Sequence, residues 1–182
     1  NQTVRYAGRA VSLGASWEPV RWFGIAGSAR FGGRIDAVND EENFRAAADV
    51  PNRFGLGARV ELAQGLTLAA RQERVEWTAM RPLVQTPTAI SNATETGVGL
   101  EYTSPLTIAI PYALRLGTSR RTLPFGVGNA AVQEQALAGG VGLLLAQGRF
   151  GVDLTYVNGR RTASGNLSEV AGTFSLGIII RP

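Results

Sequence analysis

Phe150-Gly151-Val152-Asp153-Leu154-Thr155-Tyr156 is the stretch of sequence that decides the fold. Its even-numbered residues are large and apolar, whereas its odd-numbered residues are small or polar. The same alternation runs through residues 54–62 and 174–178. A period of two residues predicts β-strands that have one apolar face and one polar face.

The connections between these strands alternate in length. Tight turns are predicted near Glu18–Arg21, Ala63–Gly65 and Ala146–Gly148. Long polar loops are predicted at Asp36–Asn52, Ala79–Thr94, Arg121–Gln133 and Gly159–Ser168. Short turns on one side of a sheet and long loops on the other are the plan of an outer-membrane β-barrel. We therefore expect the long loops on one side of the sheet and the tight turns on the opposite side.

The pattern predicts about nine strands. They cover residues 6–17, 22–35, 53–62, 66–77, 96–103, 112–121, 135–145, 149–158 and 170–181. In the fourth strand, Val75 and Trp77 break the phase of the first half, which predicts a β-bulge near Gln72–Arg74. Pro105 and Pro111 bracket an apolar stretch whose structure the pattern leaves open.

Periodicity alone allows a soluble β-sandwich or barrel with an apolar core, or a membrane barrel whose apolar face meets lipid. Three features favour the membrane. The predicted strands exceed the usual length of about 5–6 residues, and small residues dominate their polar face. Trp17, Trp22 and Trp77 lie near strand ends, which is typical of interfacial girdles. The sequence therefore predicts an all-β protein, an antiparallel transmembrane β-barrel of the bacterial outer membrane.

The number of strands bears on closure of this barrel. Bacterial single-chain barrels have an even number of strands, with short turns on the periplasmic side. The ninth strand follows a long loop and so ends on that side, and counting back places the start of the first strand on the outer side. Because an odd count that starts outside does not close, we expect residues 1–182 to be a single β-barrel domain that is incomplete at its N-terminus, the C-terminal piece of a larger barrel.

Composition narrows the possible chemistry. The chain has no His and no Cys, which excludes Ser-His and Cys-His nucleophile systems, so we expect no enzymatic activity and no cofactor. All 18 basic residues are Arg, and they are scattered along the sequence, so nucleic-acid binding is not expected. The acidic cluster of Asp36, Asp40, Glu41 and Glu42 lacks EF-hand spacing and fits a solvated loop, so no metal site is expected.

Charged residues on the polar face of the strands are the candidates for function as lumen-facing groups. They are Arg30, Arg34, Arg59, Glu61, Arg71, Glu73, Glu101, Arg115 and Asp153. In one reading, opposite charges pair and stiffen the barrel. The expected pairs are Arg59 with Glu61, Arg71 with Glu73, and Glu101 with Arg115. In the other reading, an anionic head group such as a carboxylate binds to arginines. The arginines for that role are Arg30, Arg34, Arg59 and Arg115.

The last third of the chain resembles a known family. The segments that carry the resemblance are Leu114–Gly117, Arg121–Phe125, Glu134–Leu143, Gly148–Leu154 and Ser175–Pro182. In this order they resemble the C-terminal half of the outer-membrane hydrophobic-compound transporters of the FadL/TodX-like group, which includes the long-chain fatty-acid channel. The match covers roughly residues 95–182, and the rest of the chain agrees only in pattern.

The resemblance implies a monomeric barrel of about 14 strands, an even number as in other bacterial barrels, that is plugged by an N-terminal hatch and passes hydrophobic molecules. These 182 residues do not contain the hatch or its Asn-Pro-Ala signature, so no ligand-binding residue is carried over. Pro182 stands where barrels commonly end in an aromatic residue, although the alternation continues through Phe174, Leu176 and Ile178.

We therefore expect a barrel that passes hydrophobic or amphipathic small molecules across the outer membrane. Its expected partners are outer-membrane lipid and a hydrophobic, fatty-acid-like molecule. Two alternatives stay open: a structural or adhesive barrel whose loops meet partners outside the cell, and a soluble β-barrel that binds a ligand inside. Dependence on detergent separates the soluble alternative from the others, and a hatch segment would separate transport from adhesion.

Overall fold

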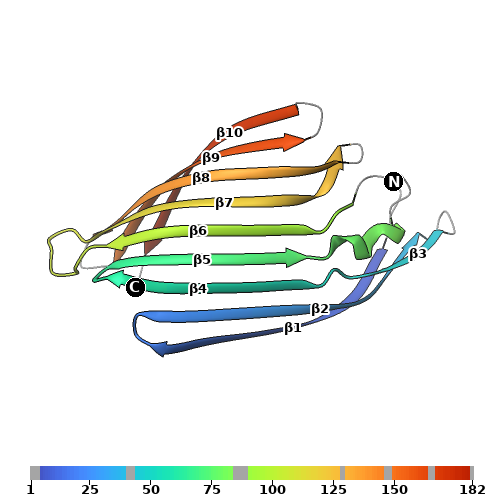
Figure 1. The fold of residues 1–182 in the computed structure, drawn as a ribbon, viewed down its shortest axis with the longest axis horizontal. Helices are drawn as coiled ribbons and strands as arrows, with labels where there is room; N and C mark the ends of the chain where they lie inside the picture. Colours follow the sequence, from blue (N-terminus) through green and yellow to red (C-terminus); the bar gives the residue numbers. More distant parts are fainter. Residues whose placement is uncertain are drawn as a thin grey trace.

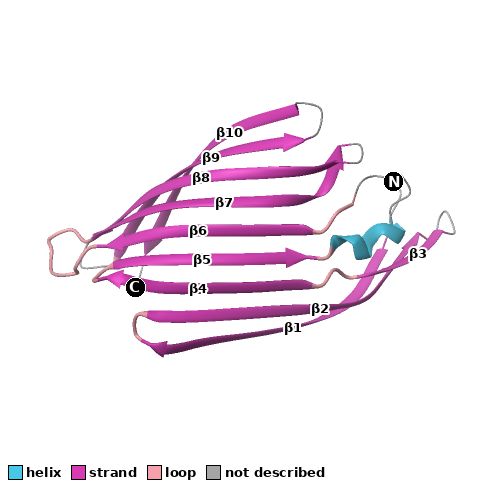
Figure 2. Cartoon of the chain, viewed as in Figure 1, coloured by secondary structure: helices cyan, strands magenta, loops and turns pink. Residues whose placement is uncertain are grey.

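The chain folds into one antiparallel β-sheet. In the computed structural model, the described residues are 5–39, 44–83, 90–127, 130–145, 149–163 and 167–180. They form ten strands and one short 3₁₀ helix (Figures 1 and 2). The all-β, antiparallel prediction is confirmed, and the strand that the sequence did not predict is the short β3.

The strand bounds follow the chain in order. They are β1 Arg5–Val20, β2 Phe23–Asn39, β3 Phe44–Asp49, β4 Arg53–Ala63, β5 Leu66–Val75, β6 Ala93–Thr103, β7 Tyr112–Val127, β8 Ala130–Leu145, β9 Phe150–Ala163 and β10 Leu167–Ile180. The 3₁₀ helix η1 spans Trp77–Leu83 between β5 and β6. Among the residues described, no helix has the length and apolar character needed to span a membrane.

Neighbouring strands in the sheet are also neighbours in the sequence, apart from β3. The order is β1-β2-β4-β5-β6-β7-β8-β9-β10, and β3 pairs with the end of β2. The sheet is strongly curved, so that β9 and β10 pass behind the other strands at one end (Figure 1). β1 and β10 form its two edges and, within the described residues, do not pair with each other.

The predicted tight turns and the predicted loops lie at opposite ends of the sheet, but the connection between β6 and β7, residues 104–111, lies at the same end as the tight turns. Helix η1 and the β9–β10 hairpin lie at one end, and the β4–β5 turn lies at the other (Figure 2). Parts of the predicted turns and loops lie outside the described residues. These parts are residues 40–43, 84–89, 128–129, 146–148 and 164–166.

Most of the predicted long loops are strand extensions. β7 continues to Val127, β9 continues to Ala163, and β2 continues to Asn39, where it pairs with β3. The prediction of long loops at residues 36–52, 121–133 and 159–168 is therefore wrong. The alternation that marks a strand in the sequence is interrupted where these extensions begin, since Arg121 and Thr122 on β7 and Arg161 and Thr162 on β9 are polar at consecutive positions.

The strand register corrects the predicted bulge. β5 pairs with β6 from Leu66 to Val75 without a register shift, so the bulge near Gln72–Arg74 is wrong. Val75 consequently shares a face with Glu73 and Arg71. Register shifts occur instead between β1 and β2, between β4 and β5 at Glu61–Ala63, and between β7 and β8.

The sheet leaves its apolar face uncovered. Leu13, Leu56 and Leu176 are 64%, 64% and 67% exposed. Among the described residues, the buried hydrophobic side chains are Ala37, Ala48, Leu123 and Val132. The accessible surface is 12827 Å² for a 19.3 kDa chain, whereas a folded monomer of this mass exposes about 8,500 Å². The apolar face is thus not folded into a core.

Candidate functional site

The polar side chains gather on one face of the sheet, which we call the inner face. The cross-strand partners show which residues share this face. They are the even-numbered residues of β8 and of residues 24–32 in β2, and the odd-numbered residues of β4, β5, β6, β7, β9 and β10. Five hollows of 240 to 440 Å³ are lined mainly by residues of this face, which is therefore the concave side of the sheet. The opposite side, the outer face, carries the large apolar side chains.

Arg115 joins three strands on the inner face. Its Nε donates a hydrogen bond to Glu101 Oε2 at 2.6 Å, and its Nη1 donates to a carboxylate oxygen of Asp153 on β9. The second contact crosses β8 at Gly142, where a Cβ would stand 2.6 Å from Asp153 Oδ1. The missing side chain therefore lets the ion pair span two strand spacings. The predicted pair of Glu101 and Arg115 is confirmed.

Arg59 crosses a strand in the same way. Its Nη2 lies 2.9 Å from Glu18 Oε1 on β1, with β2 between them. A Cβ at Gly24 on β2 would lie 3.2 Å from Arg59 Nε. The predicted pairing with Glu61 is wrong, because Glu61 Oε1 accepts the backbone N–H of Gly65 at 3.4 Å and closes the β4–β5 turn.

The remaining predicted pair, Arg71 with Glu73, is also wrong. Arg71 pairs with Glu95 on β6, and Glu73 pairs with Arg53 on β4 at 2.6 Å. Glu73 and Glu95 stand directly opposite each other across β5 and β6. Each carboxylate takes an arginine from the strand that precedes its own. The strand register decides these pairings, and alternation in the sequence does not contain the register.

A row of alternating charge continues across the far half of the inner face. Arg121, Glu134, Arg161 and Glu169 are successive cross-strand partners on β7 to β10. Glu134 lies 2.7 Å from Arg121 and 2.5 Å from Arg161, and Arg161 lies 3.7 Å from Glu169. The alternation in the sequence did not indicate this row, because its members fall at or beyond the ends of the predicted strands. The row could have been found by continuing the alternation of each strand, because each of these residues has the odd or even number of the inner-face residues on its strand.

Arg30 and Arg34 end up in different places. Arg30 stands directly opposite Arg53 on β4. A Cβ on Gly32, which lies on the inner face, would contact Val50, and so would a Cβ on Gly8. Gly8 therefore also faces the inner side. Because Gly8 is the cross-strand partner of Ile35, Ile35 lies on the inner face beyond the register shift between β1 and β2. Arg34 therefore lies on the outer face, where its Nε is 2.8 Å from Asp36 Oδ1. The structure does not bring Arg34 together with the other candidates.

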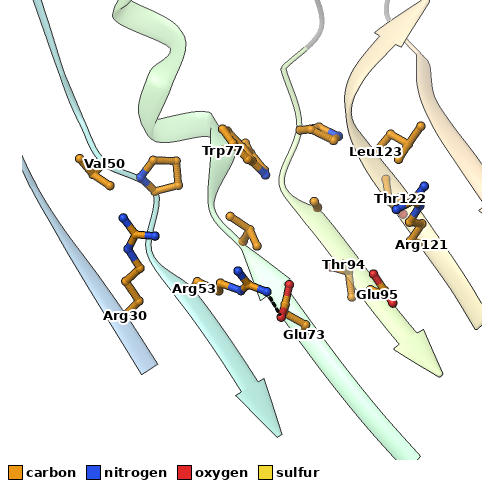
Figure 3. A pocket seen from close by; sticks show the side chains of 14 residues that line it. Arg30, Val50, Arg53, Glu73, Trp77, Thr94, Glu95, Arg121, Thr122 and Leu123 are labelled. Carbon is orange, nitrogen blue, oxygen red and sulfur yellow. Dashed lines mark hydrogen bonds and ion pairs between the residues drawn. The ribbon is translucent and has the colours of Figure 1, made fainter. Parts of the chain in front are cut away.

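A pocket of about 420 Å³ lies on the inner face beside η1, and we call it the η1 pocket. Arg30, Arg53 and Glu73 lie on one side of it, Arg121 lies on the other, and Trp77 lies between them (Figure 3). Val50, Leu123 and Pro124 add apolar wall. Trp77 was predicted to lie in an interfacial girdle, whereas it lines the pocket. Its odd number, which it shares with the inner-face residues Arg71 and Glu73, could have indicated this position.

Hydrogen bonds of Asn52 hold one wall of the η1 pocket. Asn52 Oδ1 accepts the backbone N–H of Gly32 at 3.0 Å, and its Nδ2 donates to Glu76 Oε2 at 3.1 Å. These bonds connect β2 to the start of η1 through the segment that precedes β4. Gly32 itself leaves no room for a side chain, since a Cβ would lie 1.7 Å from the carbonyl oxygen of Val50.

The opposite wall is formed by the irregular part of β7. The register shift between Thr122 and Gly126 includes Leu123 and Pro124, and a bulge tolerates the missing N–H of proline. Ser91 donates its backbone N–H to Pro124 O at 3.0 Å and its hydroxyl to Leu123 O at 3.1 Å. The segment before β6 thus supports the bulge.

The described part of the chain contains no group of three or more acidic residues that could hold a metal ion. Of the acidic cluster in the sequence, Asp36 pairs with Arg34, whereas Asp40, Glu41 and Glu42 lie outside the described residues.

Comparison with known proteins concerns the fold. No family model and no curated protein matches the sequence. Among solved structures, a chain described as "CymD monoaromatic hydrocarbon channel" is similar, with a TM-score of 0.66 and 14% sequence identity. The similarity covers 94% of this chain and 50% of that chain, so the chain spans about half the length of its structural neighbour. At this identity the likeness shows the fold alone.

Proposed function

We propose that the protein is an outer-membrane β-barrel of the FadL/TodX-like group, which passes hydrophobic or amphipathic small molecules across the bacterial outer membrane. One observation carries the proposal: an uncovered apolar outer face and a polar concave face occur in the fold of a hydrocarbon channel. Outer-membrane lipid would cover the outer face, and a fatty-acid-like molecule is one candidate cargo. The proposed activity is transport, and the sequence contains no His or Cys to serve as base or thiol nucleophile.

The apolar band on the outer face has a height that fits a membrane. On β8 it runs from Leu137 to Leu145, which is about 27 Å along a strand. A tilt of about 40° reduces this height to about 21 Å, close to the roughly 25 Å band of outer-membrane barrels. Towards the η1 end, the outer face becomes polar along one row of cross-strand partners. This row is Arg74, Thr94, Thr122, Gln133, Thr162 and Ser168. The row supports a change from lipid to water at this level.

The middle of the inner face leaves room for a solute. Ala69, Gly99, Gly117 and Ala138 are successive partners on β5 to β8. They line two hollows of about 400 and 440 Å³. Charged pairs flank these small residues towards both ends of the strands. An amphipathic molecule would find neutral surface in the middle and polar groups at either side.

The first experiment measures transport. Cells that produce the protein should take up radiolabelled toluene faster than cells that do not. Arg59→Glu should slow this uptake, because it reverses a charge beside the hollow of 440 Å³. Arg21→Glu in the β1–β2 turn is the matched control and should transport normally. Equal uptake with and without the folded protein in the outer membrane contradicts the proposal.

The second experiment measures orientation, using a sequence that has no Cys of its own. A Cys placed at Ser168 should react with a membrane-impermeant label in intact cells, and a Cys placed at Gln64 should react only after the cells are broken. The reverse labelling pattern contradicts the proposed orientation. Purified protein that stays monodisperse without detergent contradicts the membrane location and favours a soluble ligand-binding barrel.

A further inference from the structure

Arg30 carries a charge that the sheet does not neutralise. It faces Arg53 across β2 and β4, and like charges in directly opposite positions destabilise a sheet. Arg53 is compensated by Glu73 at 2.6 Å. Among the described inner-face arginines, Arg30 alone has no ion pair. An exposed guanidinium with five donors in a fixed fork is therefore free at this position.

The surroundings of Arg30 combine this charge with apolar surface. The η1 pocket places Val50 and Trp77 in the same cavity as Arg30 (Figure 3). A concave site with mainly apolar walls and a few placed polar groups is the usual form of a small-molecule site. The two carboxylates of the pocket, Glu73 and Glu95, are each held by an arginine, so the free charge in the pocket is positive.

The size of the pocket limits the ligand. A cavity of about 150 Å³ is enough to hold benzene, and the η1 pocket has about 420 Å³. A single ring with a carboxylate therefore fits. A long alkyl chain that extended from Arg30 past Trp77 would cover the charges of Glu73 and Glu95, and burying such groups under hydrocarbon is unfavourable.

We propose that the η1 pocket binds a monocyclic aromatic carboxylate, with the carboxylate paired to the Arg30 guanidinium and the ring against Trp77. This inference rests on the proposed transport function and specifies a substrate class for it. A carboxylate accepts two parallel N–H bonds from a guanidinium, which makes this pairing directional as well as charged. The Arg30 side chain then acts as the anchor at the η1 end of the path.

Binding to the protein extracted from the outer membrane into detergent micelles, and not to the 182 residues refolded alone, tests the proposal. Calorimetric titration with benzoate should show binding that weakens at high salt, whereas toluene, which has the ring but not the charge, should bind more weakly and without salt dependence. Arg30→Gln should weaken benzoate binding by about tenfold or more and leave toluene binding unchanged. Trp77→Leu should weaken both ligands. Arg21→Gln, which removes one positive charge in the β1–β2 turn, should change neither.

The same variant separates a binding role from a structural one. Because Arg30→Gln removes the like-charge contact with Arg53, the variant should unfold at a higher urea concentration even though it binds benzoate less well. Unchanged benzoate affinity in Arg30→Gln, or benzoate binding no tighter than toluene binding, overturns the proposal. If Arg30→Gln does not fold, Trp77→Leu decides, and unchanged benzoate affinity in that variant overturns the proposal. Failure of toluene uptake in cells, with Arg30-dependent benzoate binding intact, counts against the transport function and leaves the site standing.

Discussion

At the scale of single residues, glycines create the space that the inner face needs. Gly32 is the tightest case, since a Cβ would overlap the Val50 carbonyl oxygen at 1.7 Å. We predict that Gly32→Ala lowers the free energy of unfolding by about 1–3 kcal/mol or more, as overpacking does. Urea unfolding in lipid vesicles, followed by tryptophan fluorescence, measures the change.

Gly57→Ala is the matched control for Gly32→Ala. It lies on the same face, and its nearest contact to a new Cβ is Ala70 O at 3.6 Å, an ordinary packing distance. Gly57→Ala should therefore unfold close to the unchanged protein. Equal losses at the two glycines would show that the contact between Gly32 and Val50 does not limit the fold.

Gly142 tests the ion pair that crosses β8. We predict that Gly142→Ala displaces the Asp153 carboxylate from Arg115, because the new Cβ would lie 2.6 Å from Asp153 Oδ1. The loss should be about 0.2–1 kcal/mol from the exposed pair, together with a steric part. In a background with Asp153→Ala, the effect of Gly142→Ala should largely disappear, and a double-mutant cycle measures this coupling. Strictly additive effects would contradict the arrangement.

Individual pairings were only partly predictable from the sequence. Glu101 and Arg115 were expected to pair and do so, whereas Arg59 and Arg71 pair with Glu18 and Glu95. Alternation predicts which face of the sheet a side chain occupies, and these residues do lie on the polar face. It does not state the register between strands, and the register selects the partner.

At the scale of strands, β9 offers adjacent residues that face opposite surroundings. Leu154 lies on the outer face and Thr155 on the inner face. If lipid covers the outer face, Leu154→Arg should cost about 2–4 kcal/mol near the middle of the bilayer. Thr155→Arg should be tolerated better, because its side chain enters the polar concave side beside Gly140. Urea unfolding in lipid vesicles measures both variants.

Position along the strand provides a second control for the lipid face. Asn158 shares the outer face with Leu154 but lies near the polar row, so Asn158→Arg should cost about 0–1 kcal/mol. Equal losses for Leu154→Arg and Thr155→Arg would contradict two different solvents on the two faces. Equal losses for Leu154→Arg and Asn158→Arg would contradict the limited height of the apolar band.

The strands extend beyond the part of the sequence in which apolar and polar residues alternate. The alternation located the strands where one face is apolar, as in residues 150–156. It ended β7 and β9 too early, because Arg121 and Thr122, or Arg161 and Thr162, are polar on both faces. Helix η1 and β3 have no period long enough to recognise. The apolar wall of the η1 pocket comes from Val50 before β4, Trp77 of η1 and the bulge at Leu123 and Pro124. None of these lies in a regular alternating stretch, which is why the pocket could not be predicted.

At the scale of the whole molecule, the described sheet has two open edges, β1 and β10. Both edge strands carry exposed apolar residues, such as Leu13 and Leu176. In hydrocarbon, unpaired backbone N–H and C=O groups cost several kcal/mol each, so an edge must pair. We predict that these 182 residues, refolded alone in detergent, form oligomers or aggregates instead of a closed monomer. Light scattering after size-exclusion chromatography measures the mass.

Disulfide cross-linking in the same preparation shows how the edges are used. Ser12→Cys on β1 and Ser175→Cys on β10 would approach each other only if the sheet closed on itself, and the chain has no other Cys. We expect this pair to form links between chains. The matched pair Thr155→Cys and Ser175→Cys joins direct partners on β9 and β10 and should link within one chain. A monomer closed by the link from position 12 to position 175 would contradict the open-edge prediction, because the curvature of this sheet would then suffice to bring β1 and β10 together.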